Sequence, residues 1–319
     1  MRGEAKSNII NTLLRNKHEQ LSKYKIAKLA GCSYSWVHEY LDELEAKRIL
    51  KGTKVIDEAA LKGQLALGEK KERANMPILI ILAAGVGSRS LPLTKDIPKC
   101  LMKVGGKTLL ERMIGQNYAS SLTSVLVVVG HKNELVEEEL ARLKKTYRKL
   151  KAKTLFNSDY LTTNNIYSLW LARESAKNGF ILVDGDVIVD DAIIRKVNES
   201  NIPNLLLIDE DKAPEEEDVK VLMDSSGIYG IGKHIELNKS NGISVGIAKF
   251  SREGAKVLFD EVKKKLDEGK RNIFYEEAFE AMTSKIRIDT ITTGSAHWRE
   301  IDFLSEYEDA KKVFRYDQR

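Results

Sequence analysis

A loop of small residues followed by two cations is the segment of this sequence with the clearest chemical meaning. Residues 78–82 form a continuous apolar run, and residues 83–87 then supply two alanines and two glycines. Backbone N–H groups in such a loop can approach phosphate oxygens closely, and Arg89 and Lys99 add positive charge. A turn that needs glycine only for steric reasons is the alternative. The pattern predicts a nucleoside triphosphate site formed by Leu82, Ala83, Ala84, Gly85, Gly87, Ser88 and Arg89.

Two acidic residues follow a second apolar run. Asp184 and Asp186 come directly after residues 180–183, which read as a buried strand. Carboxylates at the edge of a core need a partner, and Mg²⁺ binds one or two carboxylates together with phosphates. A turn that leads into a helix near Asp191 is the competing interpretation. The pair therefore predicts a magnesium site beside the small-residue loop at 83–89, which we call the phosphate loop.

Two well-known glycine patterns are absent. The loop does not end in Gly-Lys-Ser or Gly-Lys-Thr, which excludes the phosphate loop of kinase-type proteins. It also lacks the Gly-x-Gly-x-x-Gly spacing with an acidic residue about 20 positions later, which disfavours a dinucleotide oxidoreductase.

The elements that must position these residues alternate along the chain. We expect strands at 78–82, 124–129, 153–156 and 180–183, and helices at 108–120, 134–147 and 165–176. This alternation predicts an α/β fold with a mostly parallel sheet and helices on both faces. Ligands bind such sheets at the carboxyl ends of strands, where both the loop and the acidic pair fall. Shorter β segments at 219–223 and 243–250 precede a helix at 253–268.

Composition describes an ordinary globular chain of 319 residues, long enough for two domains. No apolar run is long enough to span a bilayer, so we expect no membrane partner. The two cysteines, Cys32 and Cys100, lie in different predicted domains, which disfavours a disulfide and suits a reducing cytoplasm. The sequence leaves open whether the protein forms a homodimer.

The first quarter of the chain has a different pattern. Residues 1–75 hold 15 lysines and arginines against 10 acidic residues, whereas the remainder is balanced. Helices are expected at 7–16, 22–29 and 33–46, with a hairpin at 49–55. The segment from Lys25 to Leu41 resembles a winged helix-turn-helix. The resemblance implies an α+β domain over residues 1–68 that contacts DNA through Ser33, Tyr34, Ser35, Trp36 and His38.

Acidic residues in the third of these helices support a second interpretation. Glu39, Asp42, Glu43 and Glu45 would repel phosphate, so a packing or dimerisation module is the alternative to DNA binding. The charged run 69–75 is the expected linker, and residues 76–319 form the second domain.

Three short strings resemble one enzyme family. Leu-Ala-Ala-Gly-x-Gly-Ser-Arg at 82–89, Pro-Leu-Thr at 92–94 and Pro-Lys-x-Leu at 98–101 are similar to nucleotidyltransferases that make nucleoside-diphosphate sugars and alcohols. The resemblance implies a Rossmann-like domain in which Arg89 holds the β and γ phosphates and Lys99 bridges the α-phosphate and the incoming phosphate. It also implies that Asp186 and Asp302 hold Mg²⁺, with a helix N-cap as the alternative role of Asp302.

The string Tyr-x-x-Thr-Asn-Asn-Ile-Tyr-Ser-Leu at 160–169 resembles the bacterial and archaeal cytidylyltransferases that activate phosphocholine and related phospho-alcohols. This resemblance implies that Thr163 and Asn164 approach the base and ribose. It places an acceptor cage at Tyr275, Glu276 and Trp298, although these aromatic residues also suit ordinary helix surfaces. Phosphocholine, inositol phosphate, aminoethylphosphonate and sugar 1-phosphates remain open as acceptors.

Three functions therefore stand as hypotheses. The first is Mg²⁺-dependent transfer of a cytidylyl group from CTP to a small phosphorylated alcohol, with release of pyrophosphate. The second is a uridylyl- or thymidylyltransferase acting on a sugar 1-phosphate. The third is a transcription regulator whose transferase-like domain senses a nucleotide, and an enzyme that also represses its own pathway would combine the first and third.

Overall fold

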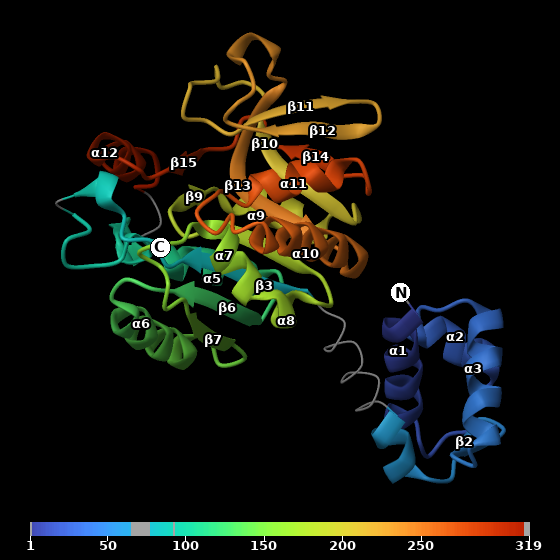
Figure 1. The fold of residues 1–319 in the computed structure, drawn as a ribbon. Helices are drawn as coiled ribbons and strands as arrows, with labels where there is room; N and C mark the ends of the chain where they lie inside the picture. The colour runs from blue at the N-terminus through green and yellow to red at the C-terminus, as the bar shows by residue number, and fades with distance from the viewer. Residues whose placement is uncertain (1, 65–76, 92, 316–319) are drawn as a thin grey trace. The chain divides into compact units, whose positions relative to one another are not determined.

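The computed structural model describes residues 2–64, 77–91 and 93–315 of the chain. The chain divides into two compact units, Met1–Met76 and Pro77–Arg319 (Figure 1). The expected linker at 69–75 lies outside the described residues. In the parts of the chain that the structure describes, no helix combines the length and the apolar character needed to cross a bilayer.

The first unit consists of helices and a short hairpin. Its elements are α1 (Arg2–Arg15), α2 (Lys23–Ala30), α3 (Tyr34–Ala46), β1 (Leu50–Lys51) and β2 (Lys54–Val55), and residues 58–64 are also helical. Ser22 caps α2 by accepting a hydrogen bond from Lys25 N, and Gly31 ends this helix in the left-handed region at φ 65°. Apolar side chains from these helices and the hairpin form one core.

One of the side chains predicted to contact DNA is packed inward. Trp36 is half-buried against the core of the first unit, and its ring stacks on Tyr40 at a centroid distance of 6.5 Å. Trp36 is therefore part of the packing of α3. Ser33, Tyr34, Ser35 and His38 are exposed.

The second unit is built on a mixed sheet. Four parallel neighbours, β8 (Phe180–Asp184), β3 (Ile78–Ala83), β6 (Ser124–Val129) and β7 (Lys151–Phe156), lie in that order. Antiparallel pairs extend the sheet from β8 through β13 (Gly242–Phe250), β11 (Lys220–Asp224) and β12 (Gly227–Gly232), while β10 (Asn204–Asp209) joins β13 to β14 (Asp289–Thr292). The expected α/β fold with parallel strands is confirmed, and the antiparallel half gives the sheet its mixed character.

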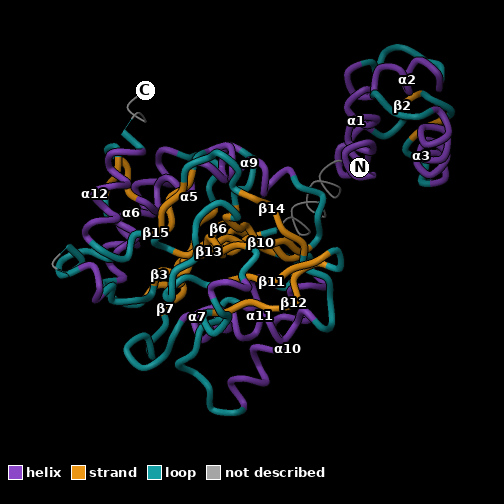
Figure 2. The backbone as a smooth tube through the Cα atoms, turned by 90° about the horizontal axis from the view of Figure 1, so that it is seen from above, coloured by secondary structure: helices purple, strands orange, loops and turns teal. Residues whose placement is uncertain are grey.

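Helices cover both faces of this sheet (Figure 2). Those on one face include α5 (Leu109–Ala119), α6 (Asn133–Thr146) and α9 (Asp191–Glu199). Those on the other face include α7 (Asn165–Leu171), α8 (Arg173–Ala176), α10 (Arg252–Asp267) and α11 (Glu276–Thr283). The single helix expected at 165–176 is thus two helices, because the chain turns at Ala172.

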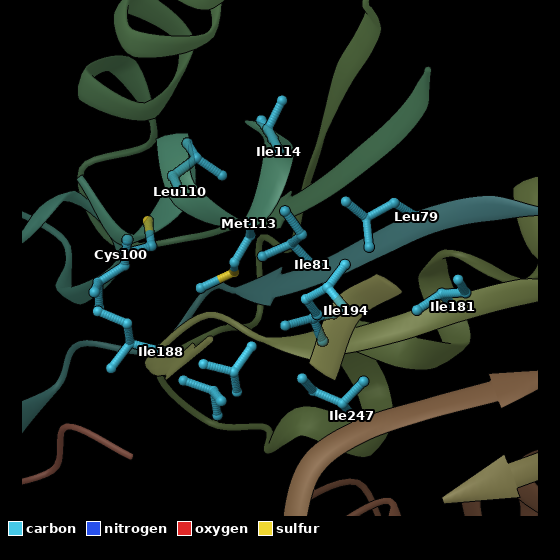
Figure 3. Packing of buried hydrophobic residues seen from close by; sticks show 14 of the residues in the cluster. Leu79, Ile81, Cys100, Leu110, Met113, Ile114, Ile181, Ile188, Ile194 and Ile247 are labelled. Carbon is cyan, nitrogen blue, oxygen red and sulfur yellow. The ribbon is translucent and has the colours of Figure 1, made fainter. Parts of the chain in front are cut away.

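Strand β3 lies at the centre of both apolar cores. Leu79 and Ile81 pack with α5 and α9 on one face, as Figure 3 shows. Ile80 and Leu82 pack with α7 and α10 on the other face. Successive side chains of a strand point to opposite faces, so a continuous apolar run is what a strand between two helical layers requires. The strand therefore holds the loop at its carboxyl end on a rigid support.

Two small pairings place the later segments near that loop. Strand β9 (Val187–Val189) pairs antiparallel with β15 (Trp298–Glu300), which places Glu300 opposite Val187. Helix α12 (Leu304–Val313) follows. Strands β4 (Lys103–Val104) and β5 (Lys107–Thr108) form a hairpin before α5, and 3₁₀ turns cover Ser88–Ser90, Lys99–Leu101 and Leu237–Lys239.

Candidate active site

A cavity of about 790 Å³ lies at the carboxyl ends of β3 and β8. The predicted nucleotide-site residues that line it are Leu82, Ala84, Gly85, Gly87, Ser88, Arg89, Thr163 and Asn164. Ala83 does not line it, because its side chain packs against the apolar core of the α5 face. The cavity therefore brings together the loop after β3 and the turn before α7.

The phosphate loop is held by its own turn. Gly87 has φ 68°, and its carbonyl accepts a hydrogen bond of 2.7 Å from Thr94 Oγ1. The backbone angle therefore favours glycine, and a Cβ atom at this position would lie only 3.0 Å from Thr94 Cγ2. A second glycine, Gly85, has open space around it. Gly87 thus shapes the loop, while Gly85 leaves the backbone accessible.

Two cations and two aspartates form one ion-pair cluster in this cavity. Lys99 Nζ lies 2.9 Å from Asp186 Oδ2 and 2.7 Å from Asp302 Oδ1. Arg89 donates to the other oxygen of Asp302 at 2.8 Å. Burial alone would lower the pKa of Lys99, but attraction by the two aspartates outweighs it and raises that pKa. Lys99 is therefore a fixed positive charge.

The helix-cap alternative for Asp302 fails on geometry, because the N-cap of α12 is Phe303. Asp302 instead directs its carboxylate to Arg89 and Lys99, and Glu306 accepts hydrogen bonds from the backbone N–H groups of Asp302 and Phe303 at 2.6 and 2.8 Å. The Asp302 carboxylate thus has no capping role.

Glu300 is a third carboxylate that sequence reasoning missed. One oxygen each from Asp186, Glu300 and Asp302 can lie within 4.8 Å of one another. Part of the Glu300 residue is exposed to solvent, whereas its carboxyl group is enclosed by the site. This enclosure and repulsion from Asp186 and Asp302 raise the pKa of the carboxyl. Its position at the end of β15, two residues before Asp302, was a usable signal, because two carboxylates so close in sequence can reach one cation.

Three carboxylates at this spacing fit a hard divalent cation such as Mg²⁺, which takes oxygen ligands. Their mutual repulsion is offset in the structure by Lys99, which bridges two of them. A cation there would therefore compete with Lys99 for the same oxygens. The chemistry of the donor set matches the predicted metal site and extends it by Glu300.

The turn before α7 has an organised polar interior. Asn164 caps the helix by accepting from Asn165 N at 2.8 Å, and Thr163 Oγ1 donates to the carbonyl of Asp159 at 2.8 Å. Asn157 and Ser168, which sequence reasoning did not select, also line the cavity and bond to each other at 3.1 Å. These side chains offer donors and acceptors at the edge where a base could lie.

The predicted acceptor cage forms only in part. Tyr275 is 2% exposed and its hydroxyl donates to Asp184 Oδ2 at 2.6 Å, so its ring does not line the cavity. Trp298 and Glu276 do line it, together with Phe274, which was not predicted. Tyr275 is corrected from a binding residue to a buried support of Asp184.

Burial also sets the protonation of this supporting pair. The pKa of Asp184 is raised well above its usual range, first by burial and then by the charge of Asp186. The pKa of Tyr275 is raised as well, by burial and by Asp184. Both groups therefore favour their protonated forms and add little charge to the cavity.

Comparison with known proteins agrees with this geometry. Residues 78–213 match the family model described as Nucleotidyl transferase. The choline-phosphate cytidylyltransferase of Streptococcus pneumoniae is 35% identical over 107 residues, which are 34% of this chain and 43% of that protein. The bifunctional IPC transferase and DIPP synthase of Aquifex aeolicus is 29% identical over 237 residues, 73% of this chain and 50% of that protein. The chain thus spans half or less of the length of these curated relatives.

Solved structures agree at the level of the fold. The CTP:phosphocholine cytidylyltransferase of Streptococcus pneumoniae superposes with a TM-score of 0.62 at 23% identity, covering 75% of this chain and 99% of that one. The mixed sheet and its covering helices are therefore shared with a nucleotidyltransferase. The part of this chain that builds the phosphate loop and the parallel strands, residues 78–213, is thus similar in sequence to nucleotidyl transferases.

Proposed function

We propose that the second unit transfers a cytidylyl group from CTP to a small phosphorylated alcohol and releases pyrophosphate. The observation that carries this proposal is the single cavity that collects the glycine loop, Lys99 and three carboxylates. The match of residues 78–213 to the nucleotidyl transferase model supports nucleotidyl transfer, and the similarity to cytidylyltransferases supports the cytidylyl group.

The reaction needs positioning and charge neutralisation more than acid–base chemistry. An oxygen of the acceptor phosphate attacks the α-phosphorus, a new P–O bond forms, and the bond to the leaving pyrophosphate breaks. The second pKa of a phosphate monoester is about 6, so the nucleophile is already ionised near neutral pH. No general base is required, and catalysis comes from holding the two phosphates in line.

Arg89 and Lys99 are assigned to the phosphates. Backbone N–H groups of the loop and Arg89 would bind the β and γ phosphates, and Lys99 would lie between the α-phosphate and the acceptor phosphate. Both cations are paired with Asp186 or Asp302 in the structure, so substrate binding must replace those pairs. Asp186, Glu300 and Asp302 would hold Mg²⁺, which when bound neutralises phosphate charge and lowers the barrier to attack.

The nucleotide preference rests on the turn before α7. Asn157, Thr163 and Asn164 line the cavity and carry side-chain amide or hydroxyl groups. We assign Thr163 and Asn164 to the base and ribose. A sugar-1-phosphate uridylyl- or thymidylyltransferase is the second candidate for the same cavity. Because CTP is a metabolite of the cytoplasm, we place the protein there.

The first experiment is a pyrophosphate-release assay with Mg²⁺. It crosses CTP, UTP, dTTP, ATP and GTP with phosphocholine, phosphoethanolamine, O-phosphoserine, aminoethylphosphonate, inositol 1-phosphate and glucose 1-phosphate. We expect release with CTP and a non-sugar acceptor. Release only with a sugar phosphate would favour the second candidate, and nucleotide binding without any release would favour a sensor.

We also propose that the first unit is a winged helix that binds DNA. The supporting observation is that two of the four acidic residues named in α3 are paired with cations: Asp42 with Lys23 at 3.0 Å, and Glu43 with both Lys6 and Lys47. The N-terminal turn of α3 is left with exposed, uncharged side chains, of which Tyr34 is 51% exposed.

Fluorescence anisotropy with labelled duplex DNA at low salt tests this second proposal. Binding should weaken steeply with salt and should fall in Tyr34→Ala. The control is Tyr229→Ala, which removes a similarly exposed tyrosine from the second unit. Equal binding by both variants would favour the packing or dimerisation module.

A further inference from the structure

Opposite charges lie close together in one part of the cavity. We call Lys212, Lys233, Phe274, Glu276 and Trp298, all of which line the cavity, the acceptor half. It contains one deeply buried carboxylate and two lysines that lie over aromatic rings. The head group of the acceptor must match this arrangement.

Glu276 has an unused hydrogen-bonding atom. Its side chain lines the cavity and the residue is only 7% exposed. Its Oε2 atom is buried and has no hydrogen-bond partner among the described residues. A buried acceptor without a donor is unfavourable until a ligand supplies one. An N–H group of a ligand ammonium would satisfy this oxygen and neutralise its charge.

The aromatic residues of the acceptor half are already covered by cations. Lys233 Nζ lies 5.0 Å from the centroid of the Phe274 ring, and Lys212 Nζ lies 5.7 Å from that of Trp298. A quaternary ammonium is recognised by open aromatic faces and has no N–H to donate. A primary ammonium bound to Glu276 therefore suits this site better than a quaternary one.

Lys233 is held by a partner that a ligand can replace. It pairs with Glu217 at 3.1 Å, but the Glu217 side chain is 77% exposed. Exposed ion pairs contribute little, so a ligand carboxylate in the cavity can take the place of Glu217. Lys233 is also near enough to Glu276 to offset part of the effect of burial on the pKa of that carboxyl. A cation and an anion thus stand ready within reach of one small ligand.

We infer that the acceptor is a phosphorylated amino acid. Its primary ammonium would donate to Glu276 and its carboxylate would bind Lys233, while its phosphate faces the α-phosphorus of the nucleotide. This inference rests on the proposed nucleotidyl transfer and specifies the substrate class of the same site.

A series of acceptors separates the two contacts. O-phosphoserine carries both charged groups, phosphoethanolamine lacks the carboxylate, and phosphocholine lacks the N–H donors as well. Inositol 1-phosphate has neither an ammonium nor a carboxylate group. The assay uses the full chain with Mg²⁺ and CTP. We expect kcat/KM for pyrophosphate release to be highest with O-phosphoserine, roughly tenfold lower with phosphoethanolamine and roughly tenfold lower again with phosphocholine.

Two variants assign the contacts. Lys233→Met should reduce kcat/KM for O-phosphoserine much more than kcat/KM for phosphoethanolamine, so that the two acceptors become nearly equal. Glu276→Gln should reduce both amines and spare any turnover of inositol 1-phosphate. The matched controls are Lys239→Met and Glu277→Gln, which change exposed residues outside the cavity.

Each outcome has a clear meaning. Turnover that is best with phosphocholine, inositol 1-phosphate or glucose 1-phosphate overturns the inference and leaves nucleotidyl transfer standing. An equal loss for both amines in Lys233→Met overturns the carboxylate contact. No release with any acceptor refutes the proposed function, and the inference falls with it.

Discussion

Lys99 is the residue on which the charge balance of the site depends. Its ammonium lies between Asp186 and Asp302 in the structure, and in the proposed reaction it moves to the phosphates. Lys99→Ala should therefore lower kcat for pyrophosphate release roughly 100- to 1,000-fold, the usual effect of losing one charge-stabilising donor. Circular dichroism should still show a folded chain. Lys153→Ala, an exposed lysine on β7, is the control, and unchanged turnover in Lys99→Ala would refute the assignment.

Glu276 should make stability depend on pH. Burial raises the pKa of its carboxyl from 4.5 to about 7 in the folded state. The folded chain therefore holds this proton more tightly than the unfolded chain, and the associated stability is lost as pH rises from about 4.5 to about 7. Glu276→Gln has no titrating carboxyl here and lacks this loss. As pH rises through this range, the free energy of unfolding of Glu276→Gln minus that of the parent should therefore increase by about 3 kcal/mol.

Urea unfolding of Glu276→Gln and the parent at pH 5 and pH 8, without substrate, measures this difference. Glu277→Gln should show no such change, because that side chain is exposed. A constant difference between Glu276→Gln and the parent at both pH values would contradict the raised pKa. The same burial that costs stability leaves Glu276 Oε2 available for a ligand, as is common at functional sites.

Single residues differ in how far the sequence predicts them. Leu82 to Arg89 follow one another directly after a strand, so their place at the sheet edge could be predicted. Glu300 ends β15 two positions before Asp302, and this short spacing between two carboxylates could have drawn attention to it. Tyr275 could not, because only tertiary packing shows that its hydroxyl faces Asp184 rather than the cavity.

At the scale of elements, the start of α12 determines where Asp302 stands. Glu306 accepts hydrogen bonds from the backbone N–H groups of Asp302 and Phe303, which fixes the turn between β15 and this helix. Glu306→Ala should lower kcat by roughly tenfold to a hundredfold, because a small displacement of a positioned group is costly. It should also lower stability by about 1–2 kcal/mol.

The matched control is Glu308→Ala on the same helix, since Glu308 is paired only at the surface with Lys311. A pyrophosphate-release assay and thermal unfolding of both variants test this role. If Glu306→Ala lost stability but kept full turnover, the carboxylate would serve the helix alone and not the placement of Asp302.

Elements with a strong pattern were predicted and the others were not. Strands β3, β6 and β8 are continuous apolar runs because both faces of the sheet are covered. The break between α7 and α8 at Ala172 has no glycine or proline to mark it. The pairing of β9 with β15 joins segments more than 100 positions apart, which residue spacing alone does not indicate.

At the scale of the whole molecule, each unit has its own apolar core. The core of the first unit contains only residues between Ile9 and Leu61, and the cores of the second contain only residues from Ile78 onward. A unit that buries its own apolar surface can fold by itself. Residues 77–319 expressed alone should therefore fold and keep kcat/KM within about twofold of the full chain, while DNA binding is lost.

Circular dichroism, pyrophosphate release and anisotropy on the same preparation test that expectation. Residues 77–319 contain the loop, Lys99, the three carboxylates and the acceptor half, so chemistry needs nothing from the first unit. A large loss of turnover with retained fold would show that the first unit acts on the site. In that case, any factor by which CTP changes the affinity for DNA must equal the factor by which DNA changes the affinity for CTP. Titrating each ligand in the presence of the other would measure this coupling factor.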